Sequence, residues 1–300
     1  MVAYMKNNLT STSRLMMGSA QFGSRYGIQN ITEKIHPKEV NSILTLAYQK
    51  GITFIDTAHT YGSSEKIIGN FIRKTGIHFS IVSKLPSTKP EQVKKIIQES
   101  LHRTSLSSLY GYLIHDITTY KNYPSIYSIL KERKSKGYID KIGFSLYFPE
   151  DLEYLLKKNI PFDLIQLPFN CFDQRFIDYF PILKRRGVEI HVRSIFLQGL
   201  FFVQPNRLPA FFKPLSQKIH HLHLLAKKTK TPISSLCLLF TLSNQYIDKI
   251  IIGVDSTKNL LENLQVFNYI PFMQNIIPKL KSLRENDEKL IVPIYWPKKS

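Results

Sequence analysis

The sequence predicts a single α/β domain folded as a closed (β/α)8 barrel, the TIM barrel. Three observations lead to this expectation. The chain has 300 residues, which suits one barrel domain of about 250 residues with a modest extension. Eight short apolar runs recur along it, and amphipathic segments separate most of them. Strands that alternate with helices indicate parallel βα units. An open doubly wound sheet is the alternative, but no G-x-G-x-x-G motif follows any predicted strand.

The predicted strands are rich in Ile, Val, Leu and Phe, as expected for strands buried on both faces. They cover residues 15–18, 52–55, 79–82, 109–114, 139–144, 162–167, 188–192 and 249–252.

The predicted helices often begin near a proline or end before a glycine, which are typical boundary signals. They cover residues 37–50, 64–74, 89–104, 123–136, 149–158, 175–186, 216–228 and 232–242. Residues 193–215 are rich in aromatic residues and proline, and we expect a long loop there, on the active-site face. The barrel core is expected at about 15–267, with a C-terminal extension at 271–300 and no second domain.

The net charge of +19 raises the question of a polyanionic partner. The basic clusters at 131–136, 184–186 and 227–230 fall on predicted helices, which form the outer ring of a barrel. No aromatic residues are interleaved with them as a stacking platform. We therefore expect no nucleic-acid partner, although a basic barrel that binds an anionic polymer stays as an alternative.

Cys171 and Cys237 are too few for a disulfide framework or a zinc site. The sequence shows no secretory leader and no apolar stretch of the roughly 20 residues that a membrane span needs. We expect a cytoplasmic protein without a membrane partner or bound metal, either monomeric or a weak homodimer.

Four ionisable residues follow three neighbouring predicted strands. Asp56 and Tyr61 come after the second strand, Lys84 after the third and His115 after the fourth. The carboxyl ends of barrel strands converge on one pocket, so we expect these side chains to meet there. Lys84 would lower the pKa of the Tyr61 phenol, and Asp56 would balance the buried lysine charge. His115 could hydrogen-bond a carbonyl oxygen. This set suits proton-coupled carbonyl reduction with hydride from a cofactor.

Six sequence blocks, in order, resemble the aldo-keto reductase superfamily, over residues 15 to about 267. They are Asp56-Thr57-Ala58 with Tyr61-Gly62 and Ser64-Glu65; Lys84 and His115; residues 141–145; Gln166 with Asn170; Ser194 with Gln198-Gly199-Leu200; and Gly253 with Glu262-Asn263. The resemblance implies that Asp56, Tyr61, Lys84 and His115 are the catalytic residues.

The resemblance also implies a nicotinamide dinucleotide in the barrel mouth. Ser145 and Gln166 would hold its carboxamide, although Leu146 stands where an Asn is common. Arg193 occupies the place of a stacking aromatic. The remaining expected cofactor contacts are Ala20, Ser194, Phe196, Gln198, Gly199, Gly253, Ser256, Lys258, Asn259, Glu262 and Asn263.

The choice between the two dinucleotides depends on residues 253–259. Asp255 would repel the 2′-phosphate of NADP(H), whereas Ser256, Thr257, Lys258 and the start of the next helix could compensate. On the family resemblance we expect NADP(H), with NAD(H) as the alternative.

The expected substrate is a small carbonyl compound, such as a sugar, an aromatic aldehyde or a ketone. The candidate substrate contacts are Phe22, Tyr26, His59, Tyr147, Asn170 and Phe172. Residues 18–23 and 26–28 are similar to a bacterial branch associated with sugar and surface-polysaccharide pathways. The alternative function is a cofactor-binding regulatory subunit of the same fold without physiological turnover.

Overall fold

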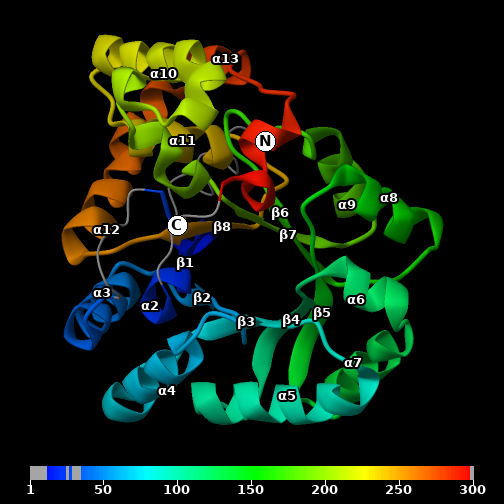
Figure 1. Ribbon diagram of the computed structural model, residues 1–300. Coiled ribbons are helices and arrows are strands. Elements are labelled where there is room, and N and C mark those ends of the chain that lie inside the picture. The colour runs from blue at the N-terminus through cyan, green and yellow to red at the C-terminus, as the bar shows by residue number, and fades with distance from the viewer. Residues whose placement is uncertain (1–11, 25–26, 29–34, 298–300) are drawn as a thin grey trace.

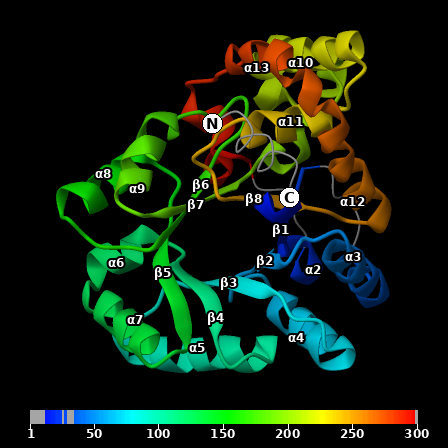
Figure 2. The ribbon, with the colours of Figure 1, turned by 180° about the vertical axis from the view of Figure 1, so that it is seen from behind.

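Eight parallel strands close into a barrel in the order β1 to β8, and helices surround it (Figure 1). This computed structural model describes residues 12–24, 27–28 and 35–297. The predicted single-domain (β/α)8 fold is confirmed. Figure 2 shows the same ring from behind, with α3, α4, α5 and α7 outside the strands.

The strands are short, and each pairs with the strand before and after it in sequence. Their bounds are β1 Leu15–Gly18, β2 Phe54–Asp56, β3 Ser80–Leu85, β4 Leu109–Ile114, β5 Ile139–Ser145, β6 Leu164–Pro168, β7 Glu189–Arg193 and β8 Lys249–Gly253. Ile52 is predicted to lie in β2 but precedes it; its amide is bonded to Ala47 of the preceding helix. Apolar residues just before a strand are thus buried without joining the sheet.

The helices largely match the predicted segments. Their bounds are α2 Ala20–Gly23, α3 Pro37–Gln49, α4 Ser64–Thr75, α5 Pro90–Thr104, α6 Ile117–Asn122, α7 Ser125–Ser135, α8 Pro149–Lys157, α9 Phe180–Arg185, α10 Ser216–Thr229, α11 Ile233–Leu242, α12 Thr257–Leu264, α13 Met273–Lys281 and α14 Glu288–Ile291. The expected long loop after β7 contains three short 3-10 turns, at Leu197–Phe202, Pro205–Arg207 and Ala210–Leu215.

The inside of the barrel is filled by one apolar layer. Its buried members are Met16, Val82, Leu113, Leu164 and Ile251, with Phe54 and Tyr110 packed against them. A separate and larger core lies between the strands and the helices. Because side chains alternate across a strand, the residue two positions after each inner residue also points inward, one layer closer to the carboxyl ends.

Close contact between β5 and β6 requires a glycine at position 143. A Cβ atom built on Gly143 would lie 1.6 Å from the backbone oxygen of Leu164. The glycine therefore lets Ser145 and Gln166, which are register partners on these strands, lie side by side.

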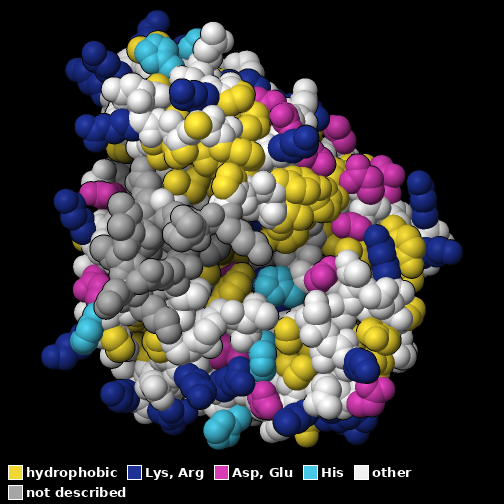
Figure 3. All heavy atoms as spheres, viewed as in Figure 1, with side chains coloured by type: hydrophobic (Ala, Val, Ile, Leu, Met, Phe, Trp, Pro, Cys, Tyr) yellow, Lys and Arg dark blue, Asp and Glu magenta, His cyan; other side chains and the backbone are white. Residues whose placement is uncertain are grey.

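On the face of the molecule shown in Figure 3, lysine and arginine side chains lie mostly toward its outer edge. Several lysines of the chain are paired: Lys134 with Asp163, Lys136 with Glu132 and Lys184 with Asp248. None of the described helices is both long enough and apolar enough to cross a membrane.

Candidate active site

The side chains at the carboxyl ends of the strands form the next inward layer. Asp56 follows Phe54, Lys84 follows Val82, His115 follows Leu113 and Gln166 follows Leu164, in each case two residues later. Ser145 ends β5 and Arg193 ends β7. The predicted catalytic and carboxamide-binding residues thus share one rim of the barrel.

A buried ion pair lies at the centre of this rim. The Lys84 side chain is fully buried, and its Nζ lies 2.6 Å from Asp56 Oδ1. The same Nζ donates to the Thr57 carbonyl at 2.9 Å and to the Tyr61 hydroxyl at 3.4 Å. Gln166 Nε2 donates to the same Asp56 oxygen at 2.8 Å. These contacts fix the lysine beside the phenol and use all three of its N–H donors.

The Tyr61 phenol keeps its proton in this environment. Burial, followed by the charge of Asp56, raises the pKa of Tyr61, while Arg193 acts in the opposite direction. The expectation that Lys84 holds this pKa low is wrong as a net effect, because burial disfavours the phenolate more strongly. At neutral pH the phenol is therefore protonated and has a proton to donate.

His115 is neutral at physiological pH. Burial, with the charges of Lys84 and Arg193, lowers the pKa of His115 to about 3. Its Nδ1 lies 3.4 Å from Thr60 Oγ1. Either atom can be the donor in this contact. In the tautomer whose proton is on Nε2, Thr60 donates to Nδ1, and Nε2 can donate to a carbonyl oxygen.

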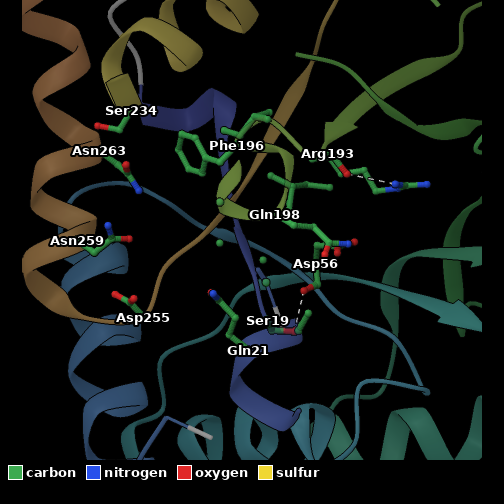
Figure 4. Close-up of a pocket in the computed structure, with 18 of the residues that line it drawn as sticks. Ser19, Gln21, Asp56, Arg193, Phe196, Gln198, Ser234, Asp255, Asn259 and Asn263 are labelled. Carbon is green, nitrogen blue, oxygen red and sulfur yellow. Dashed lines mark hydrogen bonds between the residues drawn. The ribbon is translucent and has the colours of Figure 1, made fainter. Parts of the chain in front are cut away.

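The rim opens into a cavity of about 440 Å³. Asp56 and Arg193 lie toward one end of it, and Asp255, Asn259 and Asn263 toward the other (Figure 4). The lining residues are Gly18, Ser19, Ala20, Gln21, Gly27, Asp56, Tyr61, Arg193, Ser194, Ile195, Phe196, Gln198, Gly199, Phe202, Ser234, Ile251, Gly253, Asp255, Asn259, Glu262 and Asn263.

Four buried polar atoms in this region have no hydrogen-bond partner among the described residues: Gln21 Oε1, Ser145 Oγ, Gln166 Oε1 and Asn263 Nδ2. Gln21 and Asn263 line the cavity, whereas Ser145 and Gln166 lie at the barrel rim, outside its lining. Buried polar groups are normally paired, so unpaired ones indicate a missing partner such as a ligand. The Ser145 hydroxyl and Gln166 Oε1 offer a donor and an acceptor side by side, which is the complement of a carboxamide. These residues fit the nicotinamide group that the sequence predicts.

Arg193 lies in the cavity wall as expected, with one face against an aromatic ring. Its guanidinium carbon is 4.0 Å from the centre of the Tyr147 ring. Nη2 donates to the Leu146 carbonyl at 3.0 Å, and Nη1 has a longer contact of 3.4 Å with Ser194 Oγ. Guanidinium groups stack on planar groups, so Arg193 can take the place of an aromatic residue.

The loop after β7 bends sharply beside the cavity. Ser194, Leu197, Gln198 and Gly199 all have positive φ angles, between 45° and 90°. Such backbone is costly for residues other than glycine and tends to occur at functional sites. It brings Ser194, Phe196, Gln198 and Gly199 into the cavity wall, as predicted for pyrophosphate contacts.

At the other end, Gly253, Asn259, Glu262 and Asn263 line the cavity as predicted, and Ala20 lines it beside Gln21. Ser256 instead caps α12 by accepting from the Asn259 amide. The Lys258 side chain is 86% exposed and is not part of the lining.

Several predicted substrate contacts lie elsewhere. Phe22 and Phe172 are fully buried, and Phe172 packs edge-on against Phe201, so neither presents a surface to a ligand. The Asn170 side chain is also fully buried; it bonds the Ser194 carbonyl and the amides of Phe172 and Asp173.

His59 contacts Arg103 and lies near Glu65 and Glu99, away from the cavity. Tyr26 lies outside the described residues. Of the predicted substrate contacts, Tyr147 remains close to the cavity, because its ring packs against Arg193 in the cavity wall.

The sequence analysis also missed lining residues. Gln21, Ser19 and Ser234 line the cavity and are not among the predicted contacts, whereas Phe202 belongs to the loop after β7 that is expected on this face. Gln21 and Ser19 lie in the N-terminal block 18–23, directly after β1. That position at the carboxyl end of a strand is the sequence feature that indicates a place in the cavity wall. Phe202 and Ser234 follow from the tertiary packing of the loop after β7 and of α11.

Comparisons with known proteins give matches over most of the chain. The model of the Aldo/keto reductase family matches residues 14–285. An uncharacterized oxidoreductase, YqkF of Bacillus subtilis, is 24% identical over 272 residues, covering 82% of this chain and 88% of the relative. L-galactose dehydrogenase of Arabidopsis thaliana is 24% identical over 281 residues, covering 86% and 85%.

Solved structures share the fold. The holo form of aldo-keto reductase AKR11C1 from Bacillus halodurans superposes with a TM-score of 0.75 at 18% identity, covering 92% of this chain and 95% of that one. The match of the family model to most of the chain shows that this protein belongs to the aldo/keto reductase family.

Proposed function

We propose that this chain reduces an aldehyde or ketone to an alcohol, using a nicotinamide dinucleotide as hydride source and Tyr61 as proton donor. One observation carries the proposal: the Tyr61 hydroxyl, whose proton is retained, contacts the buried ammonium of Lys84, which is paired with Asp56. A reduced nicotinamide would supply the hydride when bound.

The other rim residues have complementary tasks. His115, neutral and with Nε2 available, hydrogen-bonds the substrate oxygen. As negative charge develops on that oxygen, Tyr61 donates its proton, and Lys84 stabilises the resulting phenolate. Ser145 and Gln166 hold the carboxamide, and Arg193 lies against the ring region.

A sugar-derived carbonyl is the substrate class that we favour. L-galactose dehydrogenase of Arabidopsis thaliana and D-arabinose 1-dehydrogenase of Saccharomyces cerevisiae, the latter 28% identical over 155 residues, are named for sugar substrates. The side chains of Tyr61, His115 and Arg193 offer several hydrogen-bond donors, which suits a polyhydroxylated substrate. We also infer a cytoplasmic setting, since both cysteines are free thiols.

Replacing the phenol by Tyr61→Phe tests the mechanism. We expect the turnover number to fall by about 10²–10⁴-fold, the usual contribution of a positioned acid. Dinucleotide affinity should not change, because the ring and its contacts stay. The assay follows loss of dihydronicotinamide absorbance with a panel of sugars, aromatic aldehydes and ketones, and fluorescence titration measures binding.

Tyr48→Phe is a matched control, since Tyr48 is 43% exposed and lies on α3, outside the cavity lining. Full activity of Tyr61→Phe would overturn the mechanism. A wild-type protein that binds the dinucleotide but turns over no carbonyl would instead support the regulatory-subunit alternative.

A further inference from the structure

The two ends of the cavity differ in charge, and this bears on which dinucleotide binds. If the nicotinamide lies beside Tyr61, as the proposed function requires, the adenosine half lies at the end formed by β8 and α12. Asp255, Asn259 and Asn263 point into the cavity there (Figure 4). This end would receive the ribose that carries a 2′-phosphate in NADP(H) and a 2′-hydroxyl in NAD(H).

Within the described residues, the side-chain charges lining this end are negative. Asp255 and Glu262 contribute carboxylates, and the lining includes one basic side chain, Arg193, which lies at the opposite end. Lys258 partly offsets Glu262, because its amine lies 4.0 Å from that carboxylate, but its side chain is 86% exposed and its charge is screened by solvent. Asp255 has no basic partner among the described lining residues at this end. A 2′-phosphate placed here meets like charges, whereas a hydroxyl does not.

Two backbone amides at the start of α12 are already bonded to side chains. Free backbone N–H groups and the helix dipole make a helix N-terminus a common phosphate site. In this chain the Thr257 amide already donates to Glu39 Oε1 at 2.9 Å, and the Asn259 amide donates to Ser256 Oγ at 3.2 Å. Glu39 comes from the first turn of α3. Glu39 does not line the cavity, but its carboxylate brings a further negative charge to this helix start.

Asp255 is placed to bind a ribose hydroxyl instead. One of its oxygens accepts from the Ser256 hydroxyl at 3.1 Å. A carboxylate accepts at both oxygens, so the other can accept a hydrogen bond from a 2′-hydroxyl. Carboxylates perform this task in other NAD-binding sites.

We propose that this chain selects NAD(H) over NADP(H), and that Asp255 and Glu39 are the residues that exclude the 2′-phosphate. This differs from the NADP(H) that the sequence alone favours. Glu39 acts through the negative charge that its carboxylate holds at the Thr257 amide, and Asp255 acts by direct repulsion and by its contact with the hydroxyl.

Fluorescence titration of the full chain with NADH and with NADPH tests the proposal without any turnover. We expect NADH to bind at least about tenfold more tightly. Raising the salt concentration should reduce this ratio, because it screens the repulsion of exposed charges. Competition by 5′-AMP and by 2′,5′-ADP, measured against bound NADH, should show the same order.

The variants Asp255→Asn and Glu39→Gln, alone and combined, show whether these two residues cause the preference for NADH over NADPH. Each should tighten NADPH binding, and the combined variant most, whereas the affinity for NADH should change little or fall with Asp255→Asn. Glu39→Gln keeps an oxygen that can cap the Thr257 amide, so the fold should survive. Glu91→Gln is the control, because it removes an exposed acid from the first turn of α5 and should leave the ratio unchanged.

The outcomes separate the two proposals. NADPH binding as tight as NADH overturns the selectivity while the proposed function stands. Binding of neither dinucleotide overturns the proposed function, and the selectivity with it. A ratio that is the same in the combined variant as in the wild type shows that Glu39 and Asp255 do not set the choice.

Discussion

Each member of the buried ion pair between Lys84 and Asp56 should be needed for the stability of the barrel, because neither charge can be left without its partner in the interior. The Lys84 side chain is fully buried and Asp56 is 4% exposed. Their atoms lie 2.6 Å apart, and the lysine also bonds the Thr57 carbonyl and the Tyr61 hydroxyl. Lys84→Met keeps most of the side-chain volume and removes the charge. What remains is an Asp56 carboxylate in the interior with Gln166 as its side-chain donor.

The expected loss is about 3–5 kcal/mol in the free energy of unfolding, the usual cost of leaving one member of a buried pair unpaired. That is a large part of the roughly 5–15 kcal/mol that stabilises a typical protein. Asp56→Asn should lower the free energy of unfolding by a similar amount, because it leaves the Lys84 ammonium buried without a carboxylate partner. The double variant leaves no buried charge, so its cost should be smaller than the sum of the single costs by about 1–3 kcal/mol.

Urea unfolding followed by far-UV circular dichroism measures these differences. Lys134→Met is a matched control, because Lys134 Nζ and Asp163 lie at the same separation of 2.6 Å but both side chains are more than one third exposed. An exposed pair contributes about 0–1 kcal/mol. The reasoning fails if Lys84→Met costs no more than Lys134→Met, or if the two single costs add fully in the double variant.

Two further predictions concern the rim. Because burial lowers the pKa of His115 from 6.5 to about 3, the unfolded chain binds more protons between these values. Stability should therefore fall as the pH falls through this window, by up to about 1.4 kcal/mol per pH unit from this group. His115→Asn should flatten that part of the stability–pH profile, and an unchanged slope in urea melts would contradict it. Ser145→Ala should weaken NADH binding by about 2–10-fold, the value of one hydrogen bond, in fluorescence titrations; unchanged affinity would rule out its carboxamide contact.

Much of the fold and of the catalytic set could be predicted because both depend on local patterns. Apolar runs and helix boundaries give eight βα units, and the closed barrel follows. Once the strands are parallel, their carboxyl ends must share one rim. That is why Asp56 and Lys84, far apart in sequence, form an ion pair as expected.

Several predicted substrate contacts lie outside the cavity, because residue type does not indicate whether a loop side chain points toward the cavity or toward the core. Phe172 is aromatic and follows a strand, yet it packs against Phe201 from the loop after β7. His59 lies three residues beyond β2, but Arg103 of α5 provides a charged partner on the other side. Both outcomes depend on distant segments that the local sequence does not reveal.

The position of the Glu39 carboxylate also depends on distant segments, and it bears on the proposed choice of dinucleotide. In the sequence it is an acid in the first turn of its own helix, where it suits the dipole of α3. The packing of α3 beside α12 turns its carboxylate toward a second helix start, at the Thr257 amide. A motif such as residues 253–259 can indicate which atoms would bind a phosphate, but not whether another carboxylate already occupies them. Since that carboxylate comes from the opposite end of the chain, the proposed choice of dinucleotide depends on tertiary structure, and Glu39→Gln tests it directly.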